Sequence, residues 1–292
     1  MRIVRYLAND QADPAVGVEL DDGIRKLDVS ATGDLLSRPL AEIRSLVEDA
    51  CESTQISHDA AVLLPPIDGR TEVWAAGVTY QRSRQARVEE STTSDVYDRV
   101  YDSKRPELFF KCAAWRAVTD GEPVGIRPDS TLNVPEPELA LVANQYAELV
   151  GYLVCNDMSS RSIEGENPLY LPQAKIYAGS CALSSGIRPA WEVPAPDDLD
   201  VVLTIEHGGT VRWEGRANTR QLRRTGAELI GFLFSADQFP EGVVLSTGTG
   251  IVPDIDFTLN EGDLITVRIQ DVGTLTNGVV VGRDSFSWLT SR

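Results

Sequence analysis

The stretch that decides the fold is Val134-Pro135-Glu136-Pro137-Glu138-Leu139-Ala140-Leu141-Val142, where two glutamates precede an unbroken apolar run. Side chains alternate between the faces of a strand, so Glu136 and Glu138 point the same way, about 6–7 Å apart along the backbone. Two carboxylates on one face repel each other and favour a cation or a proton between them. Such a pair usually lies on a solvated face, but the apolar run that follows indicates a strand entering the interior.

A second apolar run, Leu149–Cys155, is followed by Asp157. This aspartate either ends the strand as a turn former or supplies a third carboxylate. Three carboxylates suit a hard ion such as Mg²⁺, with Mn²⁺ as the alternative, and do not suit zinc. Glu136, Glu138 and Asp157 are therefore candidate metal ligands. A solvated strand face followed by a turn remains the other interpretation of the same residues.

The bulk composition predicts a soluble globular protein. The chain has 292 residues, of which 42% are hydrophobic, and no apolar run approaches the about 18 residues of a membrane span. Met1–Tyr6 does not start a signal peptide, so we expect the cytoplasm. The formal net charge of −17 opposes binding to nucleic acids and to anionic membranes. Four widely spaced cysteines without a C-x-x-C motif predict reduced, mostly buried thiols.

Lysine is rare among the 27 basic residues. The lysines are Lys26, Lys104, Lys111 and Lys175. An acidic, lysine-poor composition fits either a protein adapted to a salty cytoplasm or a genome whose codons favour arginine, and the sequence leaves both open. In either case Lys111 and Lys175 lie in stretches that we assign to a site.

The order of predicted elements gives a mainly β (α+β) fold with two parts. Short strands and an amphipathic helix are expected in the first part, at Arg2–Leu7, Val16–Leu20, Ile24–Leu27 and Leu40–Val47. Pro65-Pro66 then marks a boundary near residue 70. The sequence therefore predicts a small N-terminal α+β domain, 1–70, and a larger domain, 71–292. In the larger domain a hairpin is expected around 207–210 and a helix after Thr225.

Further candidate residues lie in three other stretches. Ser83 and Arg84 follow a predicted strand, and an arginine there could hold a substrate carboxylate, although a solvated helix fits equally well. Glu107 and Lys111 stand at the two ends of an apolar strand. The run 246–250, which includes Thr249, could offer backbone N–H groups to an anion or form only a tight turn. No histidine lies in these stretches, which argues against a Ser-His-Asp hydrolase.

Taken in order, these motifs resemble the fumarylacetoacetate hydrolase family from about residue 70 to the end. The resemblance is carried by Val134–Ala140, Gly151-Tyr152, Asn156–Arg161, Lys175 and Thr247–Gly250. It implies a mixed β-roll core with a small N-terminal domain, and Mg²⁺ held by Glu136, Glu138 and Asp157. It also implies that Lys175 lies near a bound small-molecule 2-keto acid, and that the protein is a homo-oligomer, either a dimer or a tetramer.

One departure narrows the function that the resemblance implies. Hydrolases of the family commonly carry a water-activating histidine three residues after the tyrosine of the first loop, and Ser83 occupies that place here. The stretch Arg161–Lys175 is instead similar to the branch that contains 2-keto-3-deoxy-D-arabinonate dehydratase. In that branch a glutamate matching Glu107 joins the lysine as a catalytic candidate.

The expected reaction is therefore Mg²⁺-dependent dehydration of a 2-keto-3-deoxy-D-pentonate to 2,5-dioxopentanoate in oxidative pentose degradation. Lys175 is the candidate base and Glu107 the candidate proton donor, and the two roles could be reversed. The candidate substrate-binding residues are Ser83, Arg84, Lys111 and Thr249. D-arabinonate and D-xylonate lead to the same keto acid, so the feeding sugar stays open. A C–C hydrolase of the acylpyruvase kind, a β-keto acid decarboxylase and a non-catalytic 2-keto acid binding protein are the alternatives.

Overall fold

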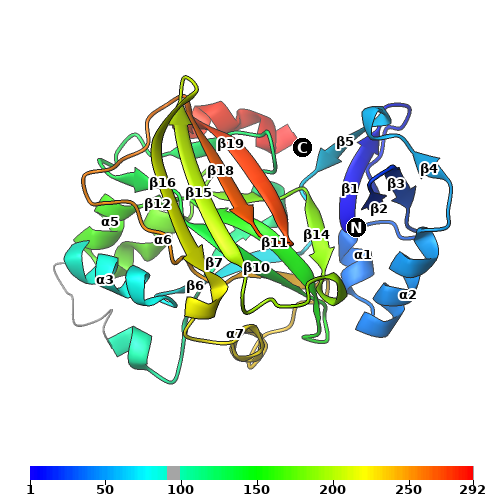
Figure 1. Cartoon of the computed structure of the whole chain (residues 1–292), viewed down its shortest axis with the longest axis horizontal. Coiled ribbons are helices and arrows are strands. Elements are labelled where there is room, and N and C mark those ends of the chain that lie inside the picture. The colour runs from blue at the N-terminus through cyan, green and yellow to red at the C-terminus, as the bar shows by residue number, and fades with distance from the viewer. Residues whose placement is uncertain (91–98, 292) are drawn as a thin grey trace.

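The computed structural model describes residues 1–90 and 99–291, which form two mixed β-sheets packed face to face with short helices around them (Figure 1). Most neighbouring strands are antiparallel, and the pairs β17–β6 and β19–β8 are parallel. The expectation of a mainly β (α+β) fold is confirmed. Among the described residues, no helix combines the length and the apolar character needed to cross a membrane.

The larger sheet has the strand order β4-β3-β2-β1-β14-β11-β10-β17-β6-β7, with β13 also on β11 and β5 also on β1. Its strands are β1 (Arg2–Ala8), β2 (Ala15–Leu20), β3 (Gly23–Lys26), β4 (Gln55–Ile56), β5 (Ala61–Leu64), β6 (Glu72–Gly77), β7 (Glu107–Ala113), β10 (Pro137–Ala143), β11 (Leu149–Asp157), β13 (Cys181–Leu183), β14 (Gly186–Pro189) and β17 (Val243–Ser246).

The smaller sheet has the order β16-β15-β18-β19-β8, and a separate pair joins β12 to β9. These strands are β8 (Val124–Ile126), β9 (Asn133–Val134), β12 (Ser159–Ser160), β15 (Asp200–His207), β16 (Thr210–Asn218), β18 (Asp263–Ile269) and β19 (Gly273–Val281). The expected hairpin is confirmed as the turn between β15 and β16.

The α-helices are short. Those whose bounds lie wholly within the described residues are α1 (Thr32–Leu36), α2 (Leu40–Ala50), α3 (Gln81–Glu90), α5 (Arg161–Glu166), α6 (Leu171–Lys175) and α7 (Gly226–Leu233). Single 3₁₀ turns lie at His58–Ala60, Ala114–Arg116, Pro168–Tyr170, Ala190–Glu192 and Thr219–Gln221, and a longer 3₁₀ segment at Arg283–Ser291. The expected helix after Thr225 is confirmed, and the Thr225 hydroxyl caps it by accepting from Glu228 N at 3.1 Å.

Strand β10 lies between two hydrophobic cores. Leu139 and Leu141 pack toward the smaller sheet, in a core that contains Leu203. Ala140 and Val142 face the other way, in a core that contains Ile43 of α2. A strand buried on both faces has no polar alternation, which explains why the apolar run after Glu138 is unbroken.

The N-terminal segment, drawn in blue at one side of Figure 1, continues the larger sheet. Strand β1 pairs with β14 through Ile3 and Ile187. Ile3 and Val18 also share a buried core with Val150 of β11. A second, smaller core around Tyr6 lies wholly within the N-terminal segment. The division into 1–70 and 71–292 stays a prediction.

The cysteines carry no disulfide. Cys112, Cys155 and Cys181 are buried, Cys51 is partly buried, and all four are free thiols. This matches the expected reduced state.

Asp68 fastens helix α1 to the larger sheet. Its carboxylate accepts hydrogen bonds from Thr32 N at 3.1 Å and Gly33 N at 3.0 Å, and it lies 3.1 Å from Arg5 Nε. The residue before the helix, Ala31, has no side chain that could cap these groups. Asp68, which lies 36 residues after Thr32, thus takes the place of a local N-cap residue.

We predict that Asp68→Ala lowers the free energy of unfolding by about 1–3 kcal/mol, because two backbone N–H groups and a guanidinium lose their acceptor. Urea denaturation measures the change. Asp284→Ala is the matched control, since the Asp284 side chain is 96% exposed. Equal unfolding curves for the Asp68 variant and the wild type would contradict this role.

Candidate active site and metal centre

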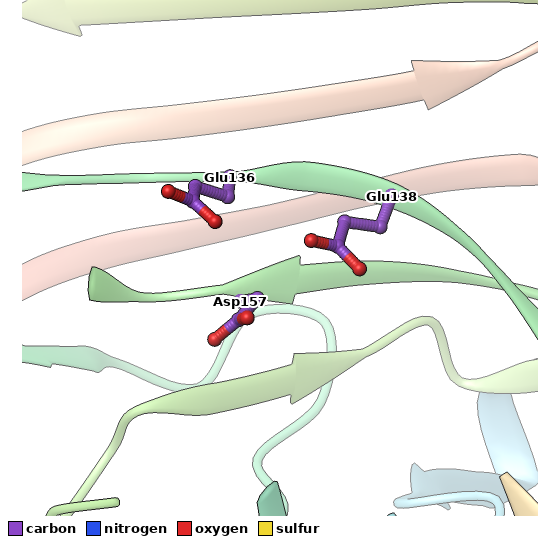
Figure 2. Close-up of side chains that lie close together, drawn as sticks. All are labelled: Glu136, Glu138 and Asp157. Atoms are coloured by element: carbon purple, nitrogen blue, oxygen red, sulfur yellow. The ribbon is translucent and has the colours of Figure 1, made fainter. Parts of the chain in front are cut away.

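The hairpin of β10 and β11 brings three carboxylates together. Pro137 lies opposite Asn156 in the antiparallel ladder, and the next bond beyond it runs from Asp157 N to Glu136 O at 2.9 Å. Glu136, Glu138 and Asp157 therefore meet at one end of the hairpin, as Figure 2 shows, with ligand oxygens within 4.8 Å of one another. The three side chains are almost completely buried. Carboxylates so buried require positive charge close by.

Lys175, the last residue of α6, supplies part of that charge. Its Nζ donates to Glu136 Oε2 at 2.7 Å, to Asp157 Oδ2 at 3.1 Å and to Ser159 Oγ at 2.6 Å. The Ser159 hydroxyl in turn donates to Asp157 O at 3.0 Å. The amino group is thus held between two candidate ligands.

Two further cations reach the same carboxylates. Arg161 Nη2 lies 3.2 Å from Glu136 Oε1, and Lys111 Nζ pairs with the second oxygen of Asp157. Lys111 is fully buried, and its Nζ also donates to Met158 O at 3.0 Å. These cations fix the orientation of Glu136 and Asp157.

Glu138 is held differently. One of its oxygens accepts from the Ser246 hydroxyl and from Gly248 N, the latter at 2.8 Å. Burial, and after it the negative charges of Asp157 and Glu136, together raise the pKa of Glu138 to about 8. A divalent cation among the three carboxylates would oppose all of these effects. The donor set therefore fits a hard ion such as Mg²⁺.

A buried cavity opens onto the three carboxylates. It is lined by Ala76, Gly77, Val78, Ser83, Glu107, Phe109, Glu136, Glu138, Asp157, Glu164, Leu171, Lys175, Gly248 and Thr249. A wider cleft beside α1 also contains charged residues, among them the ion pairs of Arg5 with Asp68 and of Arg70 with Glu241. The smaller cavity is the one that combines acid–base groups with a metal-binding set.

The structure brings most of the predicted site residues to this cavity. Glu107 and Lys175 line it, together with Ser83 and Thr249. The Ser83 hydroxyl donates to Tyr80 O at 2.8 Å, so it also holds the first turn of α3.

Arg84 and Lys111 lie elsewhere. Neither is among the residues that line the cavity. The guanidinium of Arg84 lies 5.2 Å from the centre of the Tyr101 ring. The amino group of Lys111 pairs with Asp157. In these positions Arg84 contacts an aromatic ring, and Lys111 supports a candidate ligand.

Glu164 is a cavity residue that the sequence analysis did not single out. It lies in α5, three residues after Arg161, and only 4% of its surface is exposed. Residues three apart share one face of a helix. The spacing of Arg161 and Glu164 was therefore the signal that could have found it.

Comparisons with known proteins agree with this geometry. The model of the Fumarylacetoacetate (FAA) hydrolase C-terminal family matches residues 72–280. The "Probable 2-keto-3-deoxyxylonate dehydratase" of Haloferax volcanii is 45% identical over 246 residues, 84% of this chain and 82% of the relative. The "2-dehydro-3-deoxy-D-arabinonate dehydratase" of Saccharolobus solfataricus is 42% identical over 218 residues, 73% of each chain.

A solved structure of a "2-keto-3-deoxy-D-arabinonate dehydratase complexed with magnesium and 2,5-dioxopentanoate" is also similar. It is 34% identical, with a TM-score of 0.81 over 97% of this chain and 99% of the other. The resemblance inferred from the sequence motifs is thereby confirmed, and the protein belongs to the fumarylacetoacetate hydrolase family.

Proposed function

We propose that this protein is a Mg²⁺-dependent dehydratase that converts a 2-keto-3-deoxy-D-pentonate into 2,5-dioxopentanoate and water. The observation that carries the proposal is the position of Lys175, whose amino group bonds two of the three clustered carboxylates and faces a cavity that Glu107 also lines. The names of the similar dehydratases, and the magnesium and 2,5-dioxopentanoate bound in one of them, support the same reaction.

Glu136, Glu138 and Asp157 would hold the ion, with Mn²⁺ as a substitute for Mg²⁺. A bound dication would polarise the 2-oxo group of the substrate and so make the protons on C3 acidic. The three carboxylates are already balanced by the three cationic side chains of Lys111, Arg161 and Lys175. The two further positive charges of a bound ion would favour loss of a proton from the amino group of Lys175.

Lys175 then acts as the base. A proton leaves C3 for Nζ, the electron pair of the C3–H bond forms a C2–C3 double bond, and the π pair of the 2-oxo group moves onto its oxygen. Lysine suits this role because its ammonium group can lose a proton in a suitable environment, whereas arginine stays protonated. Arg161 thus stays positively charged throughout, whereas Lys175 can release its proton and take it up again.

Glu107 acts as the acid. The 2-oxo group re-forms as an electron pair returns from its oxygen, the electron pair of the C2–C3 double bond forms a C3–C4 double bond, and the C4–O bond breaks. The departing hydroxyl takes the proton of Glu107 and leaves as water. Exchanging the roles of Lys175 and Glu107 is the alternative, and isotope exchange at C3 distinguishes the two.

Hydrolysis is less well supported. Ser83 stands where hydrolases of the family commonly carry histidine, and its hydroxyl is engaged with Tyr80. Its side chain is a poor base for water. We further propose, from the family resemblance, that the enzyme is a cytoplasmic homo-oligomer, with Ser83 and Thr249 contacting the substrate.

The first prediction concerns the metal. Glu138→Gln keeps the shape of the side chain but removes its charge, so Mg²⁺ affinity measured by titration calorimetry should fall by more than about tenfold, and activity should fall with it. Even residues that only support ligands are worth about 10–100-fold in affinity. Glu148→Gln is the control, because Glu148 lies at the other end of the same hairpin and bonds Leu40 N at 2.7 Å. Unchanged Mg²⁺ binding by the Glu138 variant would remove it from the ligand set.

The second prediction concerns the base. Lys175→Arg keeps the positive charge but cannot release the proton, so kcat should fall by about 10²–10⁴-fold. Exchange of the C3 protons of 2-oxobutyrate in deuterated water, followed by NMR, should be lost as well, while Mg²⁺ still binds. Lys26→Arg, at the exposed end of β3, serves as the control. Wild-type exchange in the Lys175 variant would transfer the role of base to Glu107.

The third prediction uses Gly77, which lies opposite Glu107 in the β6–β7 ladder. A Cβ atom at Gly77 would lie 2.2 Å from Glu107 Oε2 and 2.6 Å from its Cδ. Gly77→Ala should therefore push the carboxyl group aside, and a displacement of about 1 Å can lower kcat by about 100-fold.

Folding stability of the Gly77 variant should change little, because the clash is with the end of a flexible side chain. Gly278→Ala is the matched control, since a Cβ atom there meets nothing within 4 Å. Steady-state kinetics and thermal unfolding report the two effects separately. A Gly77 variant with the kcat of the wild type would show that the position of Glu107 does not matter.

A further inference from the structure

The proposed dehydration leaves one proton transfer without an assigned group. Loss of the C3 proton and the C4 hydroxyl gives 5-hydroxy-2-oxopent-3-enoate, which is an isomer of 2,5-dioxopentanoate. To reach the aldehyde, C5 must lose a proton from carbon and another from its hydroxyl oxygen, while C3 and C4 each gain one. A base is therefore needed beside C5, at the end of the substrate away from the carboxylate.

The cavity contains one titratable residue that the proposed roles leave unused. Of the six acidic and basic residues that line it, Glu136, Glu138 and Asp157 are candidate metal ligands, and Lys175 and Glu107 act at C3 and C4. The sixth is Glu164.

Helix α5 places Glu164 at the site. Arg161 N at the start of the helix donates to Leu132 O at 2.8 Å, and the Arg161 side chain lies 3.2 Å from Glu136. With only 4% of its surface exposed, Glu164 sits where bulk water is largely excluded. A slow, solvent-catalysed rearrangement of the intermediate is therefore disfavoured, and a protein group has to move the proton.

We propose that Glu164 is a third catalytic residue, which removes a proton from C5 and returns it to C4. The inference rests on the proposed dehydratase function. As a carboxylate, Glu164 takes the C5 proton. The electron pair of that C–H bond forms a C4–C5 double bond, the C3–C4 pair shifts to C2–C3, and negative charge moves onto the C2 oxygen.

The remaining transfers restore every group. Lys175 returns to C3 the proton that it took in the first step, and the 2-oxo group re-forms with a C4–C5 enol. Glu107, left as a carboxylate when water departed, takes the proton of the C5 hydroxyl. The enol pair then takes the proton of Glu164 at C4, and the C5 aldehyde forms. Lys175, Glu107 and Glu164 all end in their starting protonation states.

The test uses the full-length enzyme with Mg²⁺ and a substrate that carries two deuterium atoms on C5. The wild type should give an aldehyde that keeps one deuterium on C5, with part of the other deuterium at C4 in the NMR spectrum. Glu164→Gln should form the aldehyde about 10²–10⁴-fold more slowly, the usual scale of general acid–base catalysis. It should release the conjugated enoate, which ultraviolet absorbance and NMR detect.

Two further variants separate catalysis from folding. Glu166→Gln makes the same change on an exposed position of the same helix and should behave as the wild type. Glu164→Asp keeps a carboxylate and should recover part of the aldehyde formation. C3 exchange of 2-oxobutyrate should persist in Glu164→Gln within about threefold, since Lys175 is unchanged.

The outcomes distinguish a failure of the dehydratase function from a failure of the role of Glu164. A wild type that releases no water from the substrate contradicts the dehydratase function itself. A wild type that does so, together with a Glu164→Gln variant that forms the aldehyde at the same rate, overturns only the role of Glu164. Loss of C3 exchange in Glu164→Gln would likewise overturn it, because the residue would then support the site as a whole.

Discussion

The site depends on one constraint, the burial of three carboxylates with ligand oxygens within 4.8 Å of one another. Burial makes their negative charge costly unless cations lie against it. Lys175, Arg161 and Lys111 provide that charge from three different elements, α6, α5 and β7. Each of these elements is thereby tied to the β10–β11 hairpin, so the requirement for charge balance also sets the shape of the cavity.

The need to balance the buried carboxylates also explains the position of Lys111. The sequence suggested that it binds substrate, but its Nζ contacts Asp157 and donates to Met158 O and to Lys175 O. It connects a candidate metal ligand to the backbone of the residue that we propose as the base. Lys111 therefore positions both without lining the cavity, and its complete burial explains why a long, flexible side chain is held in one place.

The parts of the site that the sequence predicted are those set by local geometry. Alternation along a strand places Glu136 and Glu138 on one face, and the apolar run that follows them identified the buried strand. The contacts of Glu164, and the pairing of β1 with β14, depend on how distant segments pack. No local period encodes these contacts, so Glu164 was missed and the pairing of the N-terminal segment with the larger sheet could not be predicted.

Because lysine is rare in this chain, the presence of lysine or arginine at each cationic position of the site is informative about the chemistry there. An arginine can neutralise a carboxylate but stays protonated, so it suits Glu136 as a fixed partner. A lysine can neutralise a carboxylate and also release its proton, which is what a base beside the C3 carbon requires. Counted with every group ionised, the buried set of three carboxylates and three cations has no net charge. A dication held there, as we propose, would add positive charge to this set, and loss of a proton from Lys175, the proposed base, would offset part of it.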